Sequence, residues 1–460
     1  MLTENDLHGY QQRSITELYE HTERMAIIPM GGGKTVSTLT AFQKLQQDGH
    51  LRKGVILAPK RVAAAVWPAE VAEWEHLQGL KVSLVAGTAI QRAKALDAAA
   101  DLYVVGIDNT TWLTEQMSHW SHDDPRLDLL GVDELSRYKK PNGKRSRALS
   151  IVADKFKNRW GLTGTPMPNN ELDLFQPARI LTRRRLWDMP FDQWRMKYFM
   201  PDDPYTQFTW SLREEWQEKI WSDVAEFSFT VPAEELPPQP ELVPVVHYVD
   251  LPTRARNAFD EMLKHLITEA GGVDILAENA AVAAGKLDQI AQGFLYHDGV
   301  TVEVLHREKQ RILADLVDGS GGQQIMVTYW FKEDLHAIQT LYPGIHVLGS
   351  DTTEAGAARA IDLWNRGLIQ MLAVHPASAG HGLNLQKSHA GQIIHFCPLW
   401  SAELFDQVNA RIGRQGNNQE RVMNHLIVAR GTFDEVKLAR VAGKQNLQAA
   451  FVHFVEQWAS

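Results

Sequence analysis

The sequence predicts an α/β fold with two lobes, each of them a parallel sheet flanked by helices. In the first 180 residues, short β-branched runs alternate with longer helix-compatible segments, which is the pattern of parallel strands joined by crossover helices. The same alternation returns after residue 320. The length of 460 residues also exceeds what one ordinary hydrophobic core can organise. We therefore expect two separate sheets.

Eleven apolar runs mark the expected strands. In the first lobe they span residues 25–29, 54–59, 80–86, 102–107, 129–133 and 159–164. In the second lobe they span residues 323–329, 344–349, 369–375, 391–396 and 423–428. Short runs rich in branched aliphatic side chains are typical of strands that a parallel sheet buries on both faces.

The chain between the two series predicts a helical insertion and a linker over 183–245. The acidic stretch 231–244 within it is too rich in proline to be helical throughout, because proline lacks the N–H donor that a helix needs. The boundaries that follow are a first lobe over 1–182 and a second lobe over 246–460. We expect the second lobe to begin with a helical extension at about 253–316.

Aromatic residues crowd the insertion. They are Trp187, Trp194, Tyr198, Phe199, Trp210, Trp216 and Trp221. Such rings can stack on unpaired bases. Their mixed helical spacing is more typical of core or interdomain packing, and we favour packing.

Composition narrows the class of protein. A formal net charge of −9 argues against a protein that coats polyanions, although a local basic stripe remains compatible with nucleic-acid binding. Cys397 is the only cysteine, which excludes an internal disulfide and a zinc site built on several thiolates. The first residues lack a signal-peptide pattern, and no apolar run is long enough to span a bilayer. We expect a cytoplasmic protein.

A glycine-rich loop lies between the first predicted strand and a predicted helix. It contains Gly31, Gly32, Gly33, Lys34 and Thr35. Glycines let main-chain N–H groups approach phosphate oxygens, and a helix N-terminus favours negative charge. Lys34 is then expected to reach the β and γ phosphates, and Thr35 to donate a ligand to Mg²⁺. Ile28 departs from the P-loop pattern, which has glycine there; the alternative is a simple glycine-rich turn that caps a helix.

Two adjacent carboxylates, Asp133 and Glu134, follow the predicted strand 129–133. A phosphoryl-transfer site needs one carboxylate to hold Mg²⁺ and another acceptor to orient the attacking water. An isolated pair of acids is usually solvated surface. About 100 residues after a P-loop in an α/β pattern, the pair predicts these two catalytic roles.

Six basic residues follow the two acids directly. They are Arg137, Lys139, Lys140, Lys144, Arg145 and Arg147. Such a run can contact successive phosphates without reading bases, and its contribution to binding should fall with salt. A solvated loop is the simpler interpretation of a basic run alone. Beside the ATPase motifs we favour phosphate contact.

With these motifs in place, the chain resembles the Swi/Snf family of helicase-like, DNA-dependent ATPases in helicase superfamily 2. The matching segments follow the family's order along nearly the whole chain: "LHGYQ" (7–11), "LAPKRVAAAVWPAEVAEW" (57–74), "DELSRYKKP" (133–141), "LTGTPMPNN" (162–170), "QQIMVTYWFKEDL" (323–335), "ASAGHGLNLQ" (377–386) and "QVNARIGRQGN" (407–417). The resemblance implies two RecA-like lobes, and the compact size suggests a bacterial or bacteriophage member.

The resemblance also implies roles for single residues in the first lobe. Gln11 is expected to recognise the adenine base, and Lys34 and Thr35 to bind the triphosphate and Mg²⁺. Asp133 is expected to support the metal, and Glu134 to position or deprotonate the water. Leu135 and Ser136 depart from the family pattern, which usually has Ala-His after the acid pair.

In the second lobe, the resemblance implies that Arg411 and Arg414 act on the γ-phosphate and that Gln407 helps to sense nucleotide. Placing these groups on the opposite lobe would couple hydrolysis to closure of the lobes. Contacts to DNA are expected from Lys60, Arg61, Asn384 and the basic run, in which Lys139, Lys140, Lys144 and Arg145 are the candidates.

The function that these features predict is an ATP-driven motor that binds double-stranded DNA, largely without sequence preference, and translocates along it. One alternative is a strand-separating helicase or an enzyme of branched DNA, for which no wedge is identifiable. Another is a nucleotide-gated DNA-binding scaffold that recruits a nuclease or a replication or recombination partner. The full catalytic set argues against the scaffold. A restriction-enzyme motor subunit is a further alternative.

Overall fold

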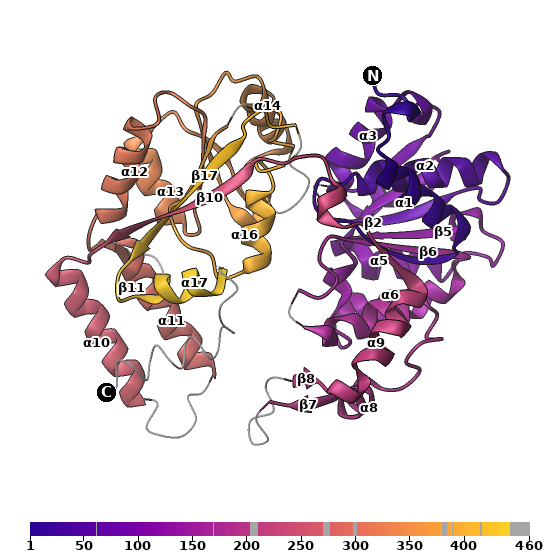
Figure 1. Ribbon diagram of the computed structural model, residues 1–460, viewed down its shortest axis with the longest axis horizontal. Helices are drawn as coiled ribbons and strands as arrows, with labels where there is room; N and C mark the ends of the chain where they lie inside the picture. Colours follow the sequence, from indigo (N-terminus) through magenta and orange to yellow (C-terminus); the bar gives the residue numbers. More distant parts are fainter. Residues whose placement is uncertain are drawn as a thin grey trace. The chain divides into compact units, whose positions relative to one another are not determined.

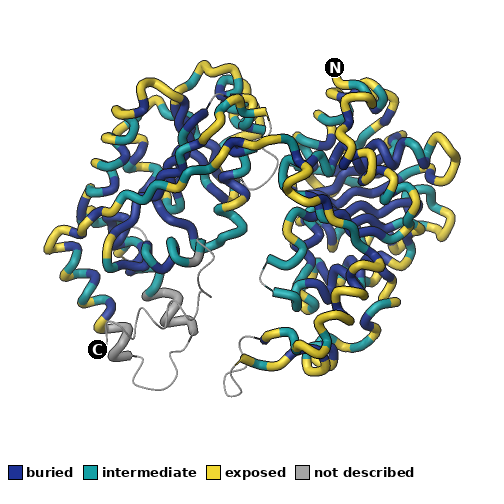
Figure 2. Tube along the Cα trace, viewed as in Figure 1, coloured by how far each residue is buried: buried dark blue, intermediate teal, exposed yellow. Residues whose placement is uncertain are grey.

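The computed structural model describes residues 1–60, 62–168, 170–202, 210–269, 277–297, 301–379, 384–388, 390–414 and 416–441. The chain divides into two compact units between Pro237 and Pro238 (Figure 1). This division falls inside the segment 183–245 that the sequence analysis assigned to an insertion and a linker. In both units the central strands of the large sheet are buried, and the covering helices turn an exposed face outward (Figure 2).

The first unit is built on a parallel sheet of seven strands. Across the sheet they are β3 (Val82–Val85), β4 (Leu102–Gly106), β2 (Gly54–Ala58), β5 (Leu129–Asp133), β6 (Asn158–Thr163), β1 (Glu23–Ile27) and β9 (Ser228–Thr230). Side chains on β2 alternate between the two faces: Val55 and Leu57 join one apolar cluster, and Ile56 and Ala58 join the other. The sheet therefore has a core on each face.

Helices flank this sheet, and all of them except the first, which precedes β1, lie in its crossover connections. They are α1 (Gly9–Glu20), α2 (Lys34–Gln47), α3 (Trp67–Glu73), α4 (Ala89–Leu96), α5 (Thr110–Met117), α6 (Lys144–Val152) and α7 (Phe175–Leu181). A local signal starts α4: Thr88 caps this helix by accepting a hydrogen bond from the Gln91 N–H. Because all strands run in the same direction, their carboxyl ends meet at one edge of the sheet.

The insertion packs against the first unit. It comprises α8 (Phe191–Tyr198), the hairpin β7 (Phe199–Pro201) and β8 (Trp210–Leu212), and α9 (Glu214–Phe227). Trp187, Trp194 and Trp210 are buried in the same apolar cluster as strand residues of the sheet. This confirms the packing interpretation for these three rings, whereas Trp221 remains 37% exposed.

The second unit is built on a parallel sheet of six strands. Across the sheet they are β10 (Glu241–Val249), β17 (Arg421–Ala429), β16 (Gln392–His395), β13 (Ile325–Thr328), β15 (Met371–Val374) and β14 (His346–Leu348). Its longer helices are α10 (Thr253–Glu269), α11 (Ala277–Gln292), α12 (Glu308–Asp318), α13 (Lys332–Leu341), α14 (Glu354–Asn365), α16 (Ala402–Asn409) and α17 (Phe433–Val441). A short helix, α15 (Pro376–Ala379), and a hairpin, β11 (Phe294–His297) with β12 (Thr301–Val304), complete it.

Each of the eleven predicted runs overlaps a strand of the two large sheets, but β9 and β10 of these sheets and the hairpin strands β7, β8, β11 and β12 were not predicted. Strand β10 begins at Glu241, inside the stretch that the sequence analysis took as linker. Pro244 is compatible with it because β10 is an edge strand that pairs on one side only, with β17 (Figure 1). Strand β9 is short and pairs with β1. Neither has the isolated apolar run that marks the other strands.

Candidate nucleotide-binding site

The phosphate loop connects the end of β1 to the first residue of α2. Gly31 and Gly33 have left-handed backbone angles, with φ of 81° and 75°. Residues other than glycine adopt these angles only at a cost in conformational energy. A Cβ atom on Gly33 would overlap the side-chain amide of Gln11. The buried Gln11, whose Oε1 accepts a hydrogen bond from the His8 N–H at 2.9 Å, is therefore in contact with the loop. The predicted adenine-reading and phosphate-binding segments meet.

Lys34 lies over the same loop. Its Nζ donates to the main-chain oxygens of Ile28 at 2.9 Å and Pro29 at 3.4 Å. Gly164, which follows β6, lies close to both groups: a Cβ atom there would be 3.7 Å from Lys34 Nζ and 3.4 Å from the Ile28 oxygen. Ile28, the residue that departs from the P-loop pattern, has its side chain buried in the apolar core, and it packs against the loop at Gly32. The sequence analysis assigned no role to Gly164.

Asp133 ends β5 at the same edge of the sheet. Its side chain is almost fully buried, and Asp133 Oδ2 accepts a hydrogen bond from Trp67 Nε1 at 3.3 Å. Burial raises the pKa of Asp133 to about 7, and the negative charge of Glu134 adds to this. The positive charge of Lys34 and the hydrogen bond from Trp67 act in the opposite direction. The carboxylate and the Lys34 ammonium therefore belong to one electrostatic site.

Glu134 leaves the strand in a left-handed conformation, with φ of 57° and ψ of 56°. For a residue with a Cβ atom this conformation costs on the order of 1 to 2 kcal/mol. Strain of this kind concentrates at functional sites, where the surrounding structure holds a side chain in place. Here it occurs at the first residue after β5, where the chain enters a short 3₁₀ helix.

These donors fit a divalent cation and a polyphosphate. A hydroxyl from Thr35 and a carboxylate from Asp133 are hard oxygen ligands of the kind that Mg²⁺ prefers. Thr35 is buried in the first turn of α2, and its main-chain N–H is among those at the helix N-terminus. A Cβ atom on Gly32 would overlap the Ile28 side chain, and one on Gly33 would overlap the Gln11 side chain, so the loop requires glycine at both positions.

The basic run after Glu134 is ordered by buried contacts. The hydroxyl groups of Tyr138 and Thr110 lie 2.6 Å apart, and Ser146 Oγ donates to the Tyr138 main-chain oxygen at 3.0 Å. Residues 135–138 form a short 3₁₀ helix, and α6 begins at Lys144. The basic run is therefore a surface segment whose backbone is held in place by buried contacts, and it is not a freely solvated loop.

Its basic side chains differ in their contacts. Lys139 pairs with Asp173 at 3.4 Å, and Arg145 pairs with Asp108 at 2.8 Å. The side chains of Lys140 and Lys144 are exposed and form no ion pair within the described part of the chain. Of the four residues in the run that are predicted to contact DNA, these two lysines are the ones that form no ion pair within the described part of the chain.

Lys60 is exposed at the carboxyl end of β2, next to β5 in the sheet. It therefore lies at the same edge as Asp133. Arg61, the other residue predicted to contact DNA here, lies outside the described residues.

In the second unit, the structure brings together two residues that the sequence analysis assigned to different ligands. Arg414 Nη2 donates to Asn384 Oδ1 at 2.5 Å and to Gln386 Oε1 at 2.7 Å. Gln407 is buried in α16, and its Nε2 donates to Glu403 Oε1 at 3.0 Å. Arg411 lies two residues after the end of α16 and is partly buried. A predicted γ-phosphate ligand and a predicted DNA ligand are thus hydrogen-bonded to each other.

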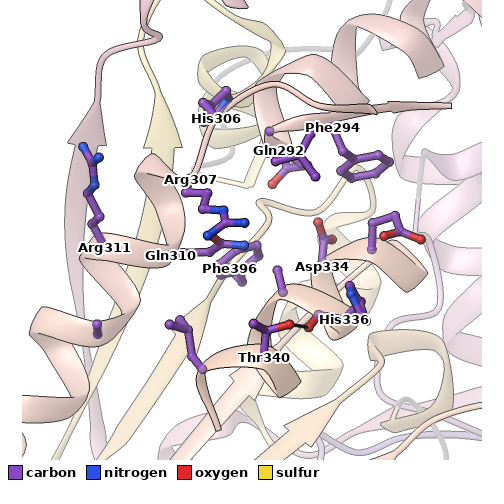
Figure 3. Close-up of a pocket in the computed structure, with 16 residues that line it drawn as sticks. Gln292, Phe294, His306, Arg307, Gln310, Arg311, Asp334, His336, Thr340 and Phe396 are labelled. Atoms are coloured by element: carbon purple, nitrogen blue, oxygen red, sulfur yellow. Dashed lines mark hydrogen bonds between the residues drawn. The ribbon is translucent and has the colours of Figure 1, made fainter. Parts of the chain in front are cut away.

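A cavity of about 460 Å³ also lies in the second unit, between α12, α13 and the β11–β12 hairpin (Figure 3). Arg307, Asp334 and Phe396 are among the residues that line it. Asp334 caps α13 by accepting hydrogen bonds from the Trp330 and Phe331 N–H groups, and burial raises its pKa to about 7. None of the predicted site residues lines this cavity.

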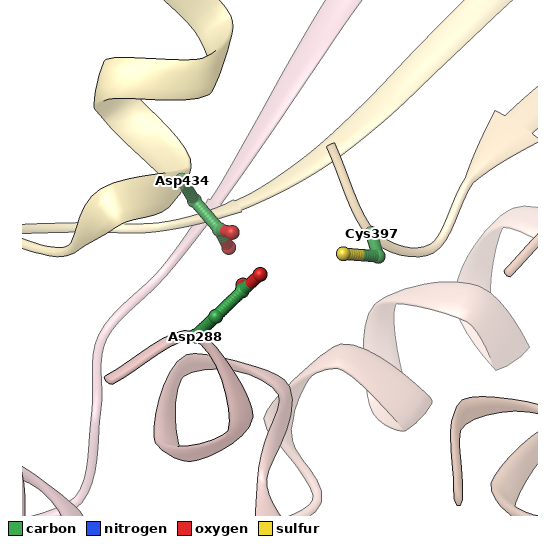
Figure 4. A group of neighbouring side chains, drawn as sticks. All are labelled: Asp288, Cys397 and Asp434. Atoms are coloured by element: carbon green, nitrogen blue, oxygen red, sulfur yellow. The ribbon is translucent and has the colours of Figure 1, made fainter. Parts of the chain in front are cut away.

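Asp288, Cys397 and Asp434 form a buried cluster whose oxygen and sulfur atoms are close enough to hold a metal (Figure 4). Two lysine ammonium groups already neutralise it. Lys309 Nζ lies 2.5 Å from Asp434 Oδ2, and Lys437 pairs with Asp288 and, at 3.6 Å, with Asp434. Burial raises the pKa of the Cys397 thiol, which keeps it neutral. The cluster is an ion-pair network that joins α11, α12 and α17.

The parallel sheet, the glycine-rich loop between β1 and α2, and the carboxylates at the end of β5 define a P-loop nucleotide-binding protein. Among the described residues, no helix combines the length and apolarity needed to cross a bilayer.

Comparison with known proteins then gives the family. The model of the SNF2-related domain matches residues 10–294. The chain is 32% identical over 455 residues to putative protein p41 of Acyrthosiphon pisum secondary endosymbiont phage 1, covering 95% of this chain and 96% of that protein. The chain belongs to the SNF2-related family, and its two units are RecA-like lobes.

Two solved structures are similar at a lower level. The Sulfolobus solfataricus SWI2/SNF2 ATPase core in complex with dsDNA is 19% identical, with a TM-score of 0.42, over 95% of this chain and 91% of that one. The Sulfolobus solfataricus SWI2/SNF2 ATPase core domain is 18% identical, with a TM-score of 0.41, over 96% and 89%. The family assignment rests on the sequence matches.

Proposed function

We propose that this protein is a DNA-dependent ATPase that translocates along double-stranded DNA. One observation carries the proposal: Gln11, Lys34, Asp133 and Glu134 converge at the carboxyl edge of one sheet, around a loop shaped for phosphate. Membership of the SNF2-related family supports the same activity.

In the proposed mechanism the first lobe holds the nucleotide. Gln11 contacts the base, and the main-chain N–H groups of the loop, together with Lys34, bind the phosphates. Thr35 and Asp133 would hold Mg²⁺, which supplies positive charge to the β and γ phosphates when it is bound. With its pKa raised to about 7, the Asp133 carboxyl group is in part protonated near neutral pH. A cation bound nearby favours the ionised form, which is the form that ligates the metal.

Glu134 orients the attacking water and accepts its proton, because it is the carboxylate adjacent to the metal-binding one. Arg411 and Arg414 stabilise the charge that develops on the γ-phosphate, and Gln407 responds to nucleotide. These groups belong to the second lobe, so hydrolysis requires the two lobes to close. Release of Arg414 from Asn384 and Gln386 would then accompany closure.

The DNA track follows from exposed basic residues at the same edge of the first sheet. Lys60, Lys140 and Lys144 are exposed there or in the segment that follows Glu134, and they can contact phosphates without reading bases. Asn384 is proposed to add a contact from the second lobe. Sequence-independent contacts of this kind are what movement along DNA requires.

Steady-state ATP hydrolysis tests the proposal. The rate is measured without nucleic acid, with single-stranded DNA, with duplex DNA and with a branched junction, and Glu134→Gln serves as the inactive control. We expect strong stimulation by duplex DNA that the control lacks. Displacement of a third strand from a triplex then tests translocation. Stimulation by single strands alone would favour a strand-separating helicase, and a rate equal to that of the control on every DNA would refute the motor.

A further inference from the structure

Trp67 connects two segments for which different tasks are proposed. Its indole is 0% exposed, and Nε1 donates to Asp133 Oδ2 at 3.3 Å. Seven residues earlier, the exposed Lys60 lies at the end of β2. Since Leu57 of β2 pairs with Val132 of β5, Lys60 and Asp133 lie at the same edge of the sheet. One stretch of chain therefore carries both the exposed Lys60 and Trp67, the residue that donates a hydrogen bond to the buried Asp133 carboxylate.

The turn between Lys60 and Trp67 is unusual. Residues Val62–Val66 form a single π-helical turn, a conformation that is rare and occurs frequently at functional sites. Helix α3 begins only at Trp67, and Pro68 in its first turn has no N–H to extend the hydrogen bonding backwards. The hydrogen bond that an N–H at position 68 would donate back into the π turn is therefore missing, which loosens the connection between the π turn and α3.

The hydrogen bond limits how the Asp133 carboxylate can rotate. Trp67 Nε1 is a donor only, and the ring is enclosed in the same apolar cluster as Ala58 and Ala63, so the indole has one fixed direction in which to donate. A change in the π turn would move this donor relative to Asp133 Oδ2. The effect would reach the nucleotide site without any contact between DNA and nucleotide.

We propose that Trp67 is a positioning residue that couples nucleic-acid contact at Lys60 to the orientation of the Asp133 carboxylate. The inference rests on the proposed function, because it assigns to that ATPase site a route by which DNA regulates it. Trp67 contacts neither ligand itself. Its role is to hold Asp133 in the productive direction when the segment after β2 is engaged.

The test compares Trp67→Phe with Trp160→Phe. The first variant keeps an aromatic ring and removes the donor. The second removes a donor from an equally buried indole, which bonds to the His21 main-chain oxygen at 3.2 Å and not to Asp133. For each protein we would measure kcat and the KM for ATP, with and without saturating duplex DNA. Comparing the ratio of stimulated to unstimulated kcat cancels any loss of folded protein.

We expect Trp67→Phe to lower the DNA-stimulated kcat about tenfold, which corresponds to about 1.4 kcal/mol. The unstimulated kcat should fall less than about threefold and the KM for ATP should change less than about twofold, since the phosphate loop is untouched. DNA affinity without nucleotide should also stay within about twofold, because the indole is buried. Trp160→Phe should leave the stimulation ratio unchanged.

A double-mutant cycle with Lys60→Ala sharpens the test. If Lys60 acts through Trp67, adding Lys60→Ala to Trp67→Phe should lower the stimulated kcat at saturating DNA by less than about twofold. Losses that multiply would show independent action and overturn the inference. A Trp67→Phe ratio equal to that of Trp160→Phe would overturn it too, and would leave the proposed function intact. If DNA fails to stimulate the wild-type protein, the proposed function itself fails, and the coupling with it.

Discussion

Replacement of Asp434 by Asn should destabilise the second unit strongly. Asp434 is fully buried and bonds to the ammonium group of Lys309 at 2.5 Å and to the Ala429 N–H at 3.0 Å, and it lies 3.6 Å from Lys437. Asn keeps the shape but removes the charge, which takes from the buried Lys309 the carboxylate with which it forms its ion pair and leaves Lys437 paired with Asp288. Breaking a buried ion pair by removing one partner costs about 3 to 5 kcal/mol, and we expect that loss in the free energy of unfolding.

The matched control is Asp362→Asn in the same unit. Asp362 pairs with Arg366 at 3.2 Å, but both side chains are more than 60% exposed. Exposed pairs of this kind contribute about 0.5 kcal/mol. Hydrogen exchange measured by mass spectrometry across a urea series gives the unfolding free energy of each unit separately, since each peptide belongs to one unit. Equal shifts for the two variants, or a loss that appears equally in the first unit, would refute the reasoning.

The pH dependence has a defined sign. Burial opposes ionisation of Asp434, but Lys309 and Lys437 outweigh it and hold the pKa of Asp434 below its usual value of 3.8. A carboxyl group whose pKa is lower in the folded state contributes stability that is fully present above its unfolded pKa. That contribution is lost as the pH falls below 3.8 and through the lowered folded pKa. The difference between wild type and Asp434→Asn should therefore shrink in acid.

Three further predictions concern the nucleotide site and the DNA track. Gly33→Ala should weaken ATP binding more than about tenfold in calorimetry, whereas Gly49→Ala, which has the same φ of 75° but open space around it, should bind normally. Glu134→Gly should abolish hydrolysis yet raise the unfolding free energy by about 0.5 to 1 kcal/mol, because glycine relieves the left-handed strain; a destabilised variant would contradict this. Combining Lys140→Ala with Lys144→Ala should reduce the slope of log affinity against log salt by about 1.8, and an unchanged slope would remove both from the DNA track.

Much of the fold and the nucleotide site could be predicted from local sequence. Eleven of the thirteen strands in the two large sheets were predicted because a buried parallel strand is a short, uninterrupted apolar run. The loop around Lys34 was found because phosphate binding needs glycines between a strand and a helix, which are consecutive in the chain. Asp133 and Glu134 were found because they follow an apolar run immediately. In each case the residues that share a task are adjacent in sequence.

Strands without such runs were missed. The pattern of β10 includes Pro244 and several exposed residues, and its identity as a strand depends on β17, which lies about 180 residues further along the chain. The ion-pair network was also not predicted from the sequence, for the same reason. Asp288, Lys309 and Lys437 come from three helices, and no spacing in the sequence announces that their charges compensate one another.

The sequence by itself determined eleven of the thirteen strands of the two large sheets, the glycine-rich loop and the two carboxylates at the end of β5. Only the tertiary structure decided which side chains contact one another. Trp67 donates a hydrogen bond to Asp133, and Lys139 pairs with Asp173 while Lys140 remains exposed. The physical reason is range. An apolar run or a glycine-rich turn is a pattern of residues within a short stretch of chain, whereas side-chain hydrogen bonds and ion pairs join groups that come together only when the sheet and its helices have packed.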